Sequence, residues 1–199
     1  MLCGGRSSRM GADKARVELE GMTLLERAIR TLEPLAPTIV LACGRAPRYA
    51  EFGRALALDR VEDGGPLAGI EAGLAASPAG YACVLAVDLP FLASVDFDAL
   101  LARVAADELD LCLARSDRGP EPLCGVYHTR LLPRIRRLLD LGERKVTSVL
   151  EHPLDGLALP RFAWLEHGLA ARAAANVNTP EDLERARRAG SETPRKAAS

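Results

Sequence analysis

The first fourteen residues, MLCGGRSSRMGADK, gather glycines, hydroxyl groups and positive charges into one short segment. Adjacent glycines let a chain turn sharply, so that successive amide N–H groups can point at one bound anion. Serine hydroxyls add further donors, and arginine and lysine add full positive charges. Because all these groups suit phosphate oxygens, we expect the segment to wrap a polyphosphate, with Arg6, Arg9 and Lys14 supplying the charge.

This segment matches neither of the two common phosphate loops. A Walker loop reads G-x-x-x-x-G-K-[ST], whereas Gly5 and Gly11 are farther apart and are followed by Ala-Asp-Lys. The dinucleotide fingerprint G-x-G-x-x-G does not occur in the sequence. On composition alone, a surface turn with scattered charges is an equally good interpretation.

Asp88 is a second candidate for chemistry. It directly follows the apolar run YACVLAV (81–87) and precedes Leu89 and Pro90. If that run is a buried strand, the carboxylate lies at its carboxyl end, where open α/β sheets bind ligands. Magnesium takes few direct carboxylates and keeps water and phosphate oxygens as its other ligands. We therefore expect Asp88 to hold a metal ion, with a helix-capping aspartate as the alternative.

The composition limits the class of protein. The chain has 199 residues, 48% of them apolar, and its 26 basic and 27 acidic residues leave a net charge of −1. This balance argues against a nucleic-acid partner, so any anion site must be local. We expect no membrane partner, because no apolar run approaches 18 residues and the start lacks a signal-peptide stretch. Five widely spaced cysteines without C-x-x-C predict buried reduced thiols and a cytoplasmic location.

Short apolar runs alternate with helical patterns along the chain. Strands are expected at residues 38–44, 81–88, 109–116, 124–129 and 162–166. Helices are expected at residues 22–32, 67–77, 96–108, 129–142 and 178–190. Because the strand runs are apolar throughout, both faces of the sheet should be covered. We predict an α/β fold, a three-layer α/β/α sandwich with a mostly parallel, Rossmann-like sheet. Residues 1–190 should form a single domain, and 191–199 a disordered tail.

The segment LCGGRSSRMGADK resembles the signature loop of the MobA-like nucleotidyltransferases, which attach a nucleotide to the molybdenum cofactor. In that family the loop reads Leu-Ala-Gly-Gly-x-Ser-x-Arg-Met-Gly-x-Asp-Lys. Further blocks resemble the family in the same order and cover nearly the whole chain: VEDGGPLAGIEAGL, AVDLPFL, EPLCGVY, LGERKVTSVLE and NVNTPEDL. The resemblance, strongest to the family's guanylyltransferases, implies transfer of GMP from GTP to the terminal phosphate of molybdopterin, with release of pyrophosphate. It also implies Mg²⁺ or Mn²⁺ as cofactor, and molybdoenzymes or their chaperones as recipients.

The resemblance assigns roles to residues at matching positions. Catalysis falls to Arg9, Lys14 and Asp88, with Asp88 as the metal ligand. Nucleotide binding falls to Leu2, Cys3, Gly4, Gly5, Lys14, Asp63, Gly69 and Asp88. Acceptor binding falls to Arg144, beside Lys145, and to Asn176 and Asn178. The competing interpretations are a loop-to-helix turn at Asp63, surface charge at Arg144 and Lys145, and turn or cap chemistry at the two asparagines.

Two departures from the family pattern leave the function less sharply defined. The family has β-branched residues before its loop that form a central strand. This chain starts at Met1, so we expect that strand to be nearly absent or supplied by residues upstream. Gly44 stands where the family often carries an asparagine near the nucleobase, which leaves a cytidylyltransferase open. A sugar-phosphate nucleotidyltransferase and a nucleotide-binding partner protein without turnover also stay open.

Overall fold

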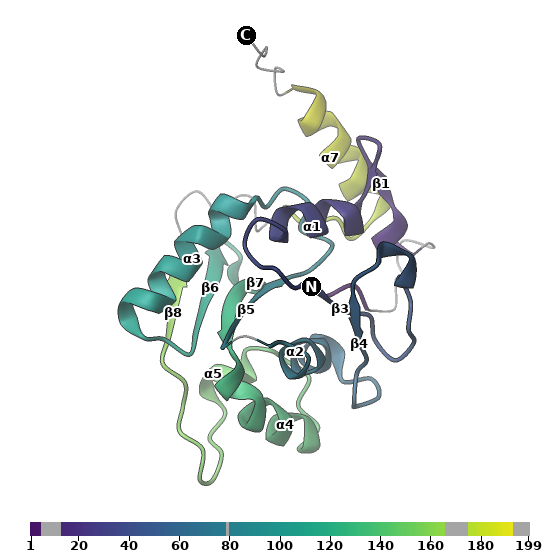
Figure 1. Ribbon diagram of the computed structural model, residues 1–199. Coiled ribbons are helices and arrows are strands. Elements are labelled where there is room, and N and C mark those ends of the chain that lie inside the picture. Colours follow the sequence, from purple (N-terminus) through teal and green to yellow (C-terminus); the bar gives the residue numbers. More distant parts are fainter. Residues whose placement is uncertain (5–12, 79, 166–174, 193–199) are drawn as a thin grey trace.

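Helices cover both faces of a central sheet whose strands come from distant parts of the chain (Figure 1). The computed structural model describes residues 1–4, 13–78, 80–165 and 175–192. Its strands are β1 (Glu18–Leu19), β2 (Met22–Thr23), β3 (Val40–Ala42), β4 (Ala55–Ala57), β5 (Tyr81–Leu85), β6 (Leu111–Ser116), β7 (Gly119–His128) and β8 (Phe162–Leu165). Its α-helices are α1 (Leu24–Leu32), α2 (Gly65–Ala75), α3 (Ser94–Asp107), α4 (Leu132–Asp140), α5 (Ser148–Glu151) and α7 (Pro180–Glu192). Short 3-10 turns occupy Lys14–Arg16, Ala50–Phe52 and Thr129–Leu131.

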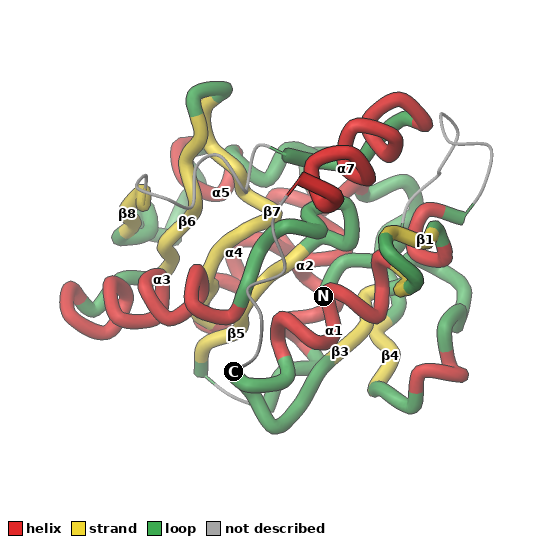
Figure 2. Tube along the Cα trace, turned by 90° about the horizontal axis from the view of Figure 1, so that it is seen from above, coloured by secondary structure: helices red, strands yellow, loops and turns green. Residues whose placement is uncertain are grey.

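The opening residues join two parts of the sheet. One part is the parallel pair β3–β4, and the other has the strand order β5-β7-β6-β8. Leu2 lies between them and forms parallel bridges to Ala42 on one side and to Ala86 on the other. Both views place the N-terminus between β3 and β5 (Figures 1 and 2). The central strand is thus reduced to a single bridging residue in the described structure.

The sheet is mixed, so the prediction of a mostly parallel sheet is wrong. β3–β4 and β6–β8 are parallel, whereas β5–β7 and β6–β7 are antiparallel. The reversal comes from a hairpin in which Ser116 pairs with Gly119, leaving Asp117 and Arg118 as a two-residue turn. Continuous apolarity indicates that both faces are buried but carries no information on strand direction. The predicted α/β class, with helices on both faces of the sheet, is confirmed.

Two apolar cores fill the space on either side of the sheet. One is built from α1, α3 and the strands that pack against them, around Leu24, Leu25, Phe97 and Leu100. The other is built from α2, α4 and α5, around Leu67, Ile70, Ile135, Leu138 and Val149. Leu2 packs against both cores. The opening segment is therefore held by packing as well as by its bridges.

Cap chemistry sets the helix boundaries that position the site. At the start of α1, the Glu26 amide donates to Thr23 Oγ1 at 3.2 Å, and the Thr23 amide donates to Glu26 Oε2 at 2.8 Å. This capping box starts α1 at Leu24, two residues after the predicted start. α7 continues through Gly190 to Glu192, two residues beyond its predicted end, and residues 193–199 of the expected tail lie outside the described ranges. Within those ranges, no helix has the length and apolar character needed to cross a membrane.

Candidate active site

A cleft of about 890 Å³ opens where Leu2, β3, β4 and β5 end at the same edge of the sheet. This volume lies in the range typical of small-molecule sites. Among its lining residues are seven that the sequence proposes for the nucleotide: Leu2, Cys3, Gly4, Lys14, Asp63, Gly69 and Asp88. Two further candidates, Gly5 and Arg9, fall outside the described residues.

Lys14, Asp88 and Asn178 meet inside this cleft. The Lys14 ammonium lies 3.3 Å from Asp88 Oδ2 and donates a 2.7 Å hydrogen bond to Asn178 Oδ1. The two charged side chains are 18% and 23% exposed, so water screens them less than it would at an open surface. The Val177 amide also donates to the Asp88 carbonyl oxygen at 2.8 Å. Three segments that are remote in sequence therefore converge on one ion pair.

Close backbone packing shapes the floor of the cleft. A Cβ atom at Gly4 would lie 2.4 Å from the Gly44 nitrogen, so only glycine fits at position 4. Gly44 has a φ of +79°, in the left-handed region that favours glycine. The Gly4 amide donates to the Ala42 carbonyl oxygen at 2.9 Å. Gly4 thus brings two backbone segments together, and its own N–H bonds to protein rather than pointing at an anion.

Asp59 is a cleft residue that the sequence analysis missed. It follows β4, and its amide donates to the Gly44 carbonyl oxygen at 2.8 Å. Its Oδ1 atom is buried and has no hydrogen-bond partner within the described part of the chain. Burial raises the pKa of Asp59, and the neighbouring Glu71 carboxylate raises it further. The signal was present in the sequence, because Asp59 follows the apolar run Ala55–Leu58 just as Asp88 follows its own run.

A second cavity, of about 320 Å³, adjoins the cleft. Both are lined by Pro66, Asp88 and Leu123. The second cavity is also lined by Glu121, Lys145, Thr147 and Asn176. Asp88 thus borders both spaces.

The residues proposed for the acceptor do not all lie together. Asn176 lines the second cavity, whereas Asn178 lines the first cleft beside Lys14. The Arg144 guanidinium donates to the backbone oxygens of Asp63 at 2.8 Å and Glu143 at 2.9 Å, which fixes the loop before α2. The neighbouring Lys145 faces the second cavity instead. The resemblance assigned acceptor binding to Arg144, whereas it is Lys145 that lines the second cavity.

The carboxylate donors of the cleft suit a metal ion that arrives with phosphate. No group of three or more His, Cys, Asp or Glu side chains able to hold a metal occurs among the described residues. Asp88 offers one carboxylate, and its partner in the structure is already a cation, Lys14. Mg²⁺ commonly binds to one or two carboxylates, with water and substrate phosphates completing its shell. The donor set therefore fits a metal ion that is shared with a bound polyphosphate.

The cysteine that lines the cleft is poorly suited to act as a nucleophile. All five lie in the described ranges and are free thiols. Burial raises the pKa of Cys3, which lines the cleft, to about 12, and that of Cys83 and Cys112 to about 11. Such thiols stay protonated near neutral pH and react poorly. Four of the five thiols are buried as predicted, whereas Cys83 is only partly buried.

The chain matches known proteins over most of its length. A model of the MobA-like NTP transferase domain matches residues 1–157. A probable molybdenum cofactor guanylyltransferase of Natronomonas pharaonis is 34% identical over 195 residues, covering 94% of this chain and 95% of the relative. One from Deinococcus radiodurans is 35% identical over 180 residues, covering 90% and 88%.

Solved structures agree with these matches. Molybdopterin-guanine dinucleotide biosynthesis protein A from Archaeoglobus fulgidus superimposes with a TM-score of 0.79 at 26% identity, covering 96% of this chain and 97% of that one. The manganese complex of Rv0371C from Mycobacterium tuberculosis shares the fold, with a TM-score of 0.65 at 16% identity and coverage of 94% and 95%. Domain match, full-length relatives and fold agree, and the chain belongs to the MobA-like NTP transferase family.

Proposed function

We propose that this chain is a molybdenum cofactor guanylyltransferase, which transfers GMP from GTP to the terminal phosphate of molybdopterin or molybdenum cofactor and releases pyrophosphate. The observation that carries the proposal is the meeting of Lys14 and Asp88, 74 residues apart, at the boundary between two cavities. The larger cavity has room for a nucleoside triphosphate, and the smaller adjoins it at Asp88. Full-length relatives at 34% and 35% identity that are named as probable guanylyltransferases support the same reaction.

The reaction joins two polyanions. An oxygen of the acceptor phosphate forms a bond to the α-phosphorus of GTP, and the bond from that phosphorus to the bridging oxygen of pyrophosphate breaks. Lys14, together with Arg9, neutralises charge that develops on the leaving pyrophosphate. Asp88 holds Mg²⁺ or Mn²⁺, which when bound stabilises charge on the phosphate oxygens. Asp63, Gly69 and the backbone of Leu2–Gly4 line the nucleotide side.

The second cavity takes the acceptor in this proposal. Lys145 supplies an exposed ammonium for the terminal phosphate. Thr147 and Asn176 supply a hydroxyl and a carboxamide that can bond to polar atoms of the pterin. Because Asp88 borders both cavities, the attacking phosphate and the α-phosphorus would approach each other there. The product then passes to molybdoenzymes or to their chaperones.

Asp59 supports a nucleoside ligand in the cleft. A buried acceptor without a donor costs free energy, and a ligand N–H or O–H group would recover it. Guanine carries adjacent donors at N1 and at its exocyclic amino group, which suit a carboxylate. The choice of guanine can therefore rest on Asp59, although Gly44 offers no side chain to the base.

We also infer that residues 1–190 act as one nucleotidyltransferase domain, because the segment before α7 contributes Asn178 to the same cleft. The five free thiols support a reducing, cytoplasmic location.

Pyrophosphate release with each of the four nucleoside triphosphates, in the presence of Mg²⁺ and molybdopterin, tests the function. GTP should give the highest kcat/KM, and Asp88→Ala should abolish turnover without loss of the native circular dichroism spectrum. Faster turnover of CTP would favour a cytidylyltransferase, and dependence on a sugar 1-phosphate would favour a sugar-phosphate enzyme. GTP binding without pyrophosphate release would favour a binding protein.

A further inference from the structure

The Asp88 carboxylate has two candidate cations to bind, the Lys14 ammonium and a divalent metal ion. In the structure its carboxylate lies 3.3 Å from the Lys14 ammonium. In the proposed function, on which this inference rests, the same carboxylate faces a divalent cation. An ammonium and a divalent cation at one carboxylate repel each other, and partial burial strengthens the repulsion. The two cations should therefore compete for Asp88.

Lys14 has a second acceptor that does not depend on Asp88. Its 2.7 Å hydrogen bond to Asn178 Oδ1 is shorter than its contact with the carboxylate. The backbone N–H of Asn178 donates to Asp182 Oδ2 at 3.0 Å, and the same oxygen accepts from the backbone N–H of Thr179 at 3.0 Å. These bonds anchor Asn178 to the first turn of α7. An anchored, neutral oxygen can hold an ammonium group when the carboxylate is taken by another cation.

We propose that Lys14 is a displaceable counter-ion of Asp88, and that Asn178 is the positioning residue that keeps Lys14 in the cleft when Asp88 turns to a divalent cation. Lys14 neutralises Asp88 while the cleft lacks nucleotide and metal. When both bind, its ammonium turns from the carboxylate to the phosphates and pivots on Asn178. Asn178 thus acts through Lys14 and does not bind the acceptor.

Affinity for Mn²⁺ without nucleotide tests the competition directly. Free Mn²⁺ is measured by electron paramagnetic resonance with wild-type protein, Lys14→Met and Arg103→Met. Lys14→Met should bind Mn²⁺ on the order of tenfold more tightly, because the competing charge is gone. Arg103→Met is the matched control, since it removes one positive charge from α3, which lines neither cavity, and should change affinity less than twofold. No gain in Lys14→Met, or an equal gain in both variants, would overturn the proposal.

The location of the bound ion is checked in the Lys14→Met background. Adding Asp88→Asn should remove the whole gain in Mn²⁺ affinity. A gain that survives this second substitution would place the ion elsewhere and contradict the exchange at Asp88.

A double-mutant cycle tests the role of Asn178. Asn178→Leu should weaken Mn²⁺ binding several-fold in the wild-type background, because Lys14 then loses the Asn178 acceptor and leaves Asp88 less readily. In the Lys14→Met background the same substitution should have no effect. An equal loss in both backgrounds would make Asn178 a direct metal ligand and refute its positioning role.

A spectroscopic readout on the wild-type chain follows Lys14 itself. The chain has only three lysines, Lys14, Lys145 and Lys196, so the ¹H–¹³C signals of labelled lysine Cε groups can be assigned. Added Mg²⁺ should move the Lys14 signal in wild-type protein and leave it in place in Asp88→Asn. Movement in both proteins would refute displacement from Asp88. Turnover of GTP and molybdopterin is scored separately, so the proposed function can stand or fall independently of these results.

Discussion

The phenolic oxygen of Tyr49 lies 2.8 Å from Oδ1 and 3.0 Å from Oδ2 of Asp13, the residue directly before Lys14. Asp13 Oδ1 also accepts from the Ala15 amide at 3.2 Å, which caps the short turn that carries Lys14. Tyr49 is buried and has a φ of +71°, an uncommon value for a bulky residue. Such backbone strain persists only where its surroundings enforce it. Tyr49 therefore sets the position of the turn that carries the lysine, although it does not itself line the cleft.

Tyr49→Phe removes the hydroxyl donor and keeps the ring. We expect KM for GTP to rise about fivefold, because loss of one hydrogen bond of roughly 1 kcal/mol loosens the turn that carries Lys14. Steady-state kinetics measures the effect. Tyr81→Phe is the control, since its hydroxyl donates to the Leu109 carbonyl oxygen at 2.9 Å at the other end of the sheet. Equal changes of KM in the two variants would show that the effect is not specific to Lys14.

Asp59→Asn should separate stability from ligand binding. Because the pKa of Asp59 is raised, the folded protein binds this proton more tightly than the unfolded chain, and the ionised carboxylate destabilises the fold near neutral pH. The variant should therefore be more stable than wild type at pH 7. The excess free energy of unfolding of the variant over wild type should shrink as the pH falls toward the ordinary pKa of an aspartate side chain. Urea denaturation at both pH values measures this difference.

The same Asp59→Asn substitution should raise KM for GTP about tenfold, since a charged acceptor for the nucleoside is lost. Glu62→Gln removes an equal charge from the exposed rim of the cleft, where Glu62 pairs with Arg45 at 2.9 Å. Net charge alone would favour GTP binding in both variants. A lower KM in Asp59→Asn would therefore argue against contact with the nucleoside.

In a chain that begins at Met1, the buried α-amino group makes the fold sensitive to pH. It donates to the Val40 carbonyl oxygen at 2.8 Å, and burial lowers its pKa from 8.0 to about 6. Between these values the unfolded chain holds the proton and the folded chain does not. The free energy of unfolding should therefore rise from pH 6 to pH 8, by about 2 kcal/mol.

N-terminal acetylation is the matched comparison for this effect. It removes the titrating group but keeps one N–H donor, and an apolar cavity of about 160 Å³ beside Met1 has room for the acetyl group. The free energy of unfolding of the acetylated form minus that of the free-amine form, measured by urea denaturation, should fall from pH 6 to pH 8. Only the free-amine form gains stability over this range. A difference that is constant from pH 6 to pH 8 would contradict the assignment.

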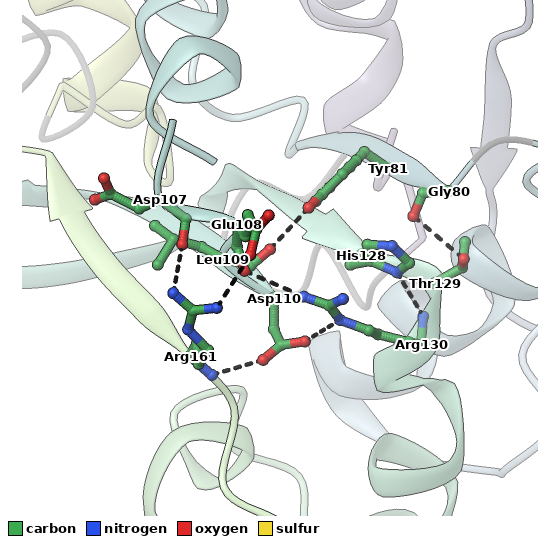
Figure 3. Close-up of polar contacts among 10 residues, drawn as sticks. All are labelled: Gly80, Tyr81, Asp107, Glu108, Leu109, Asp110, His128, Thr129, Arg130 and Arg161. Atoms are coloured by element: carbon green, nitrogen blue, oxygen red, sulfur yellow. Dashed lines mark hydrogen bonds and ion pairs between the residues drawn. The ribbon is translucent and has the colours of Figure 1, made fainter. Parts of the chain in front are cut away.

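Asp110 holds together the end of the sheet opposite the cleft. Figure 3 shows its carboxylate between Arg130 and Arg161, bonded to the Arg130 guanidinium and, at 2.6 Å, to the Arg161 amide. Asp110→Asn should lower the free energy of unfolding by about 2 kcal/mol, because charge-assisted bonds are lost at a side chain that is 15% exposed. KM for GTP should stay unchanged. Asp140→Asn breaks an exposed pair with Arg60 and should cost less than about 1 kcal/mol.

Sequence reasoning succeeded where local chemistry decides the outcome. The Thr23–Glu26 box fixes the start of α1, and Asp88 lies beyond a buried strand as its neighbours predict. It failed where the interacting residues are far apart in the sequence. Nothing near Asn178 indicates that its side chain would bond to Lys14, 164 residues away. Strand direction was missed for a different reason, because apolar runs indicate burial, while the reversal comes from the local turn at Asp117 and Arg118.

Leu2 is synthesised before either of its partners in the sheet, since Ala42 and Ala86 lie 40 and 84 positions later. A nascent chain must therefore keep this apolar segment unpaired until two later strands have left the ribosome. Contacts of such long sequence separation slow folding and prolong the exposure of apolar, aggregation-prone surface. Placing the opening segment at the centre of the sheet thus ties formation of the catalytic cleft to the last stages of folding, and a chaperone that shields the emerging N-terminus should raise the yield of active enzyme.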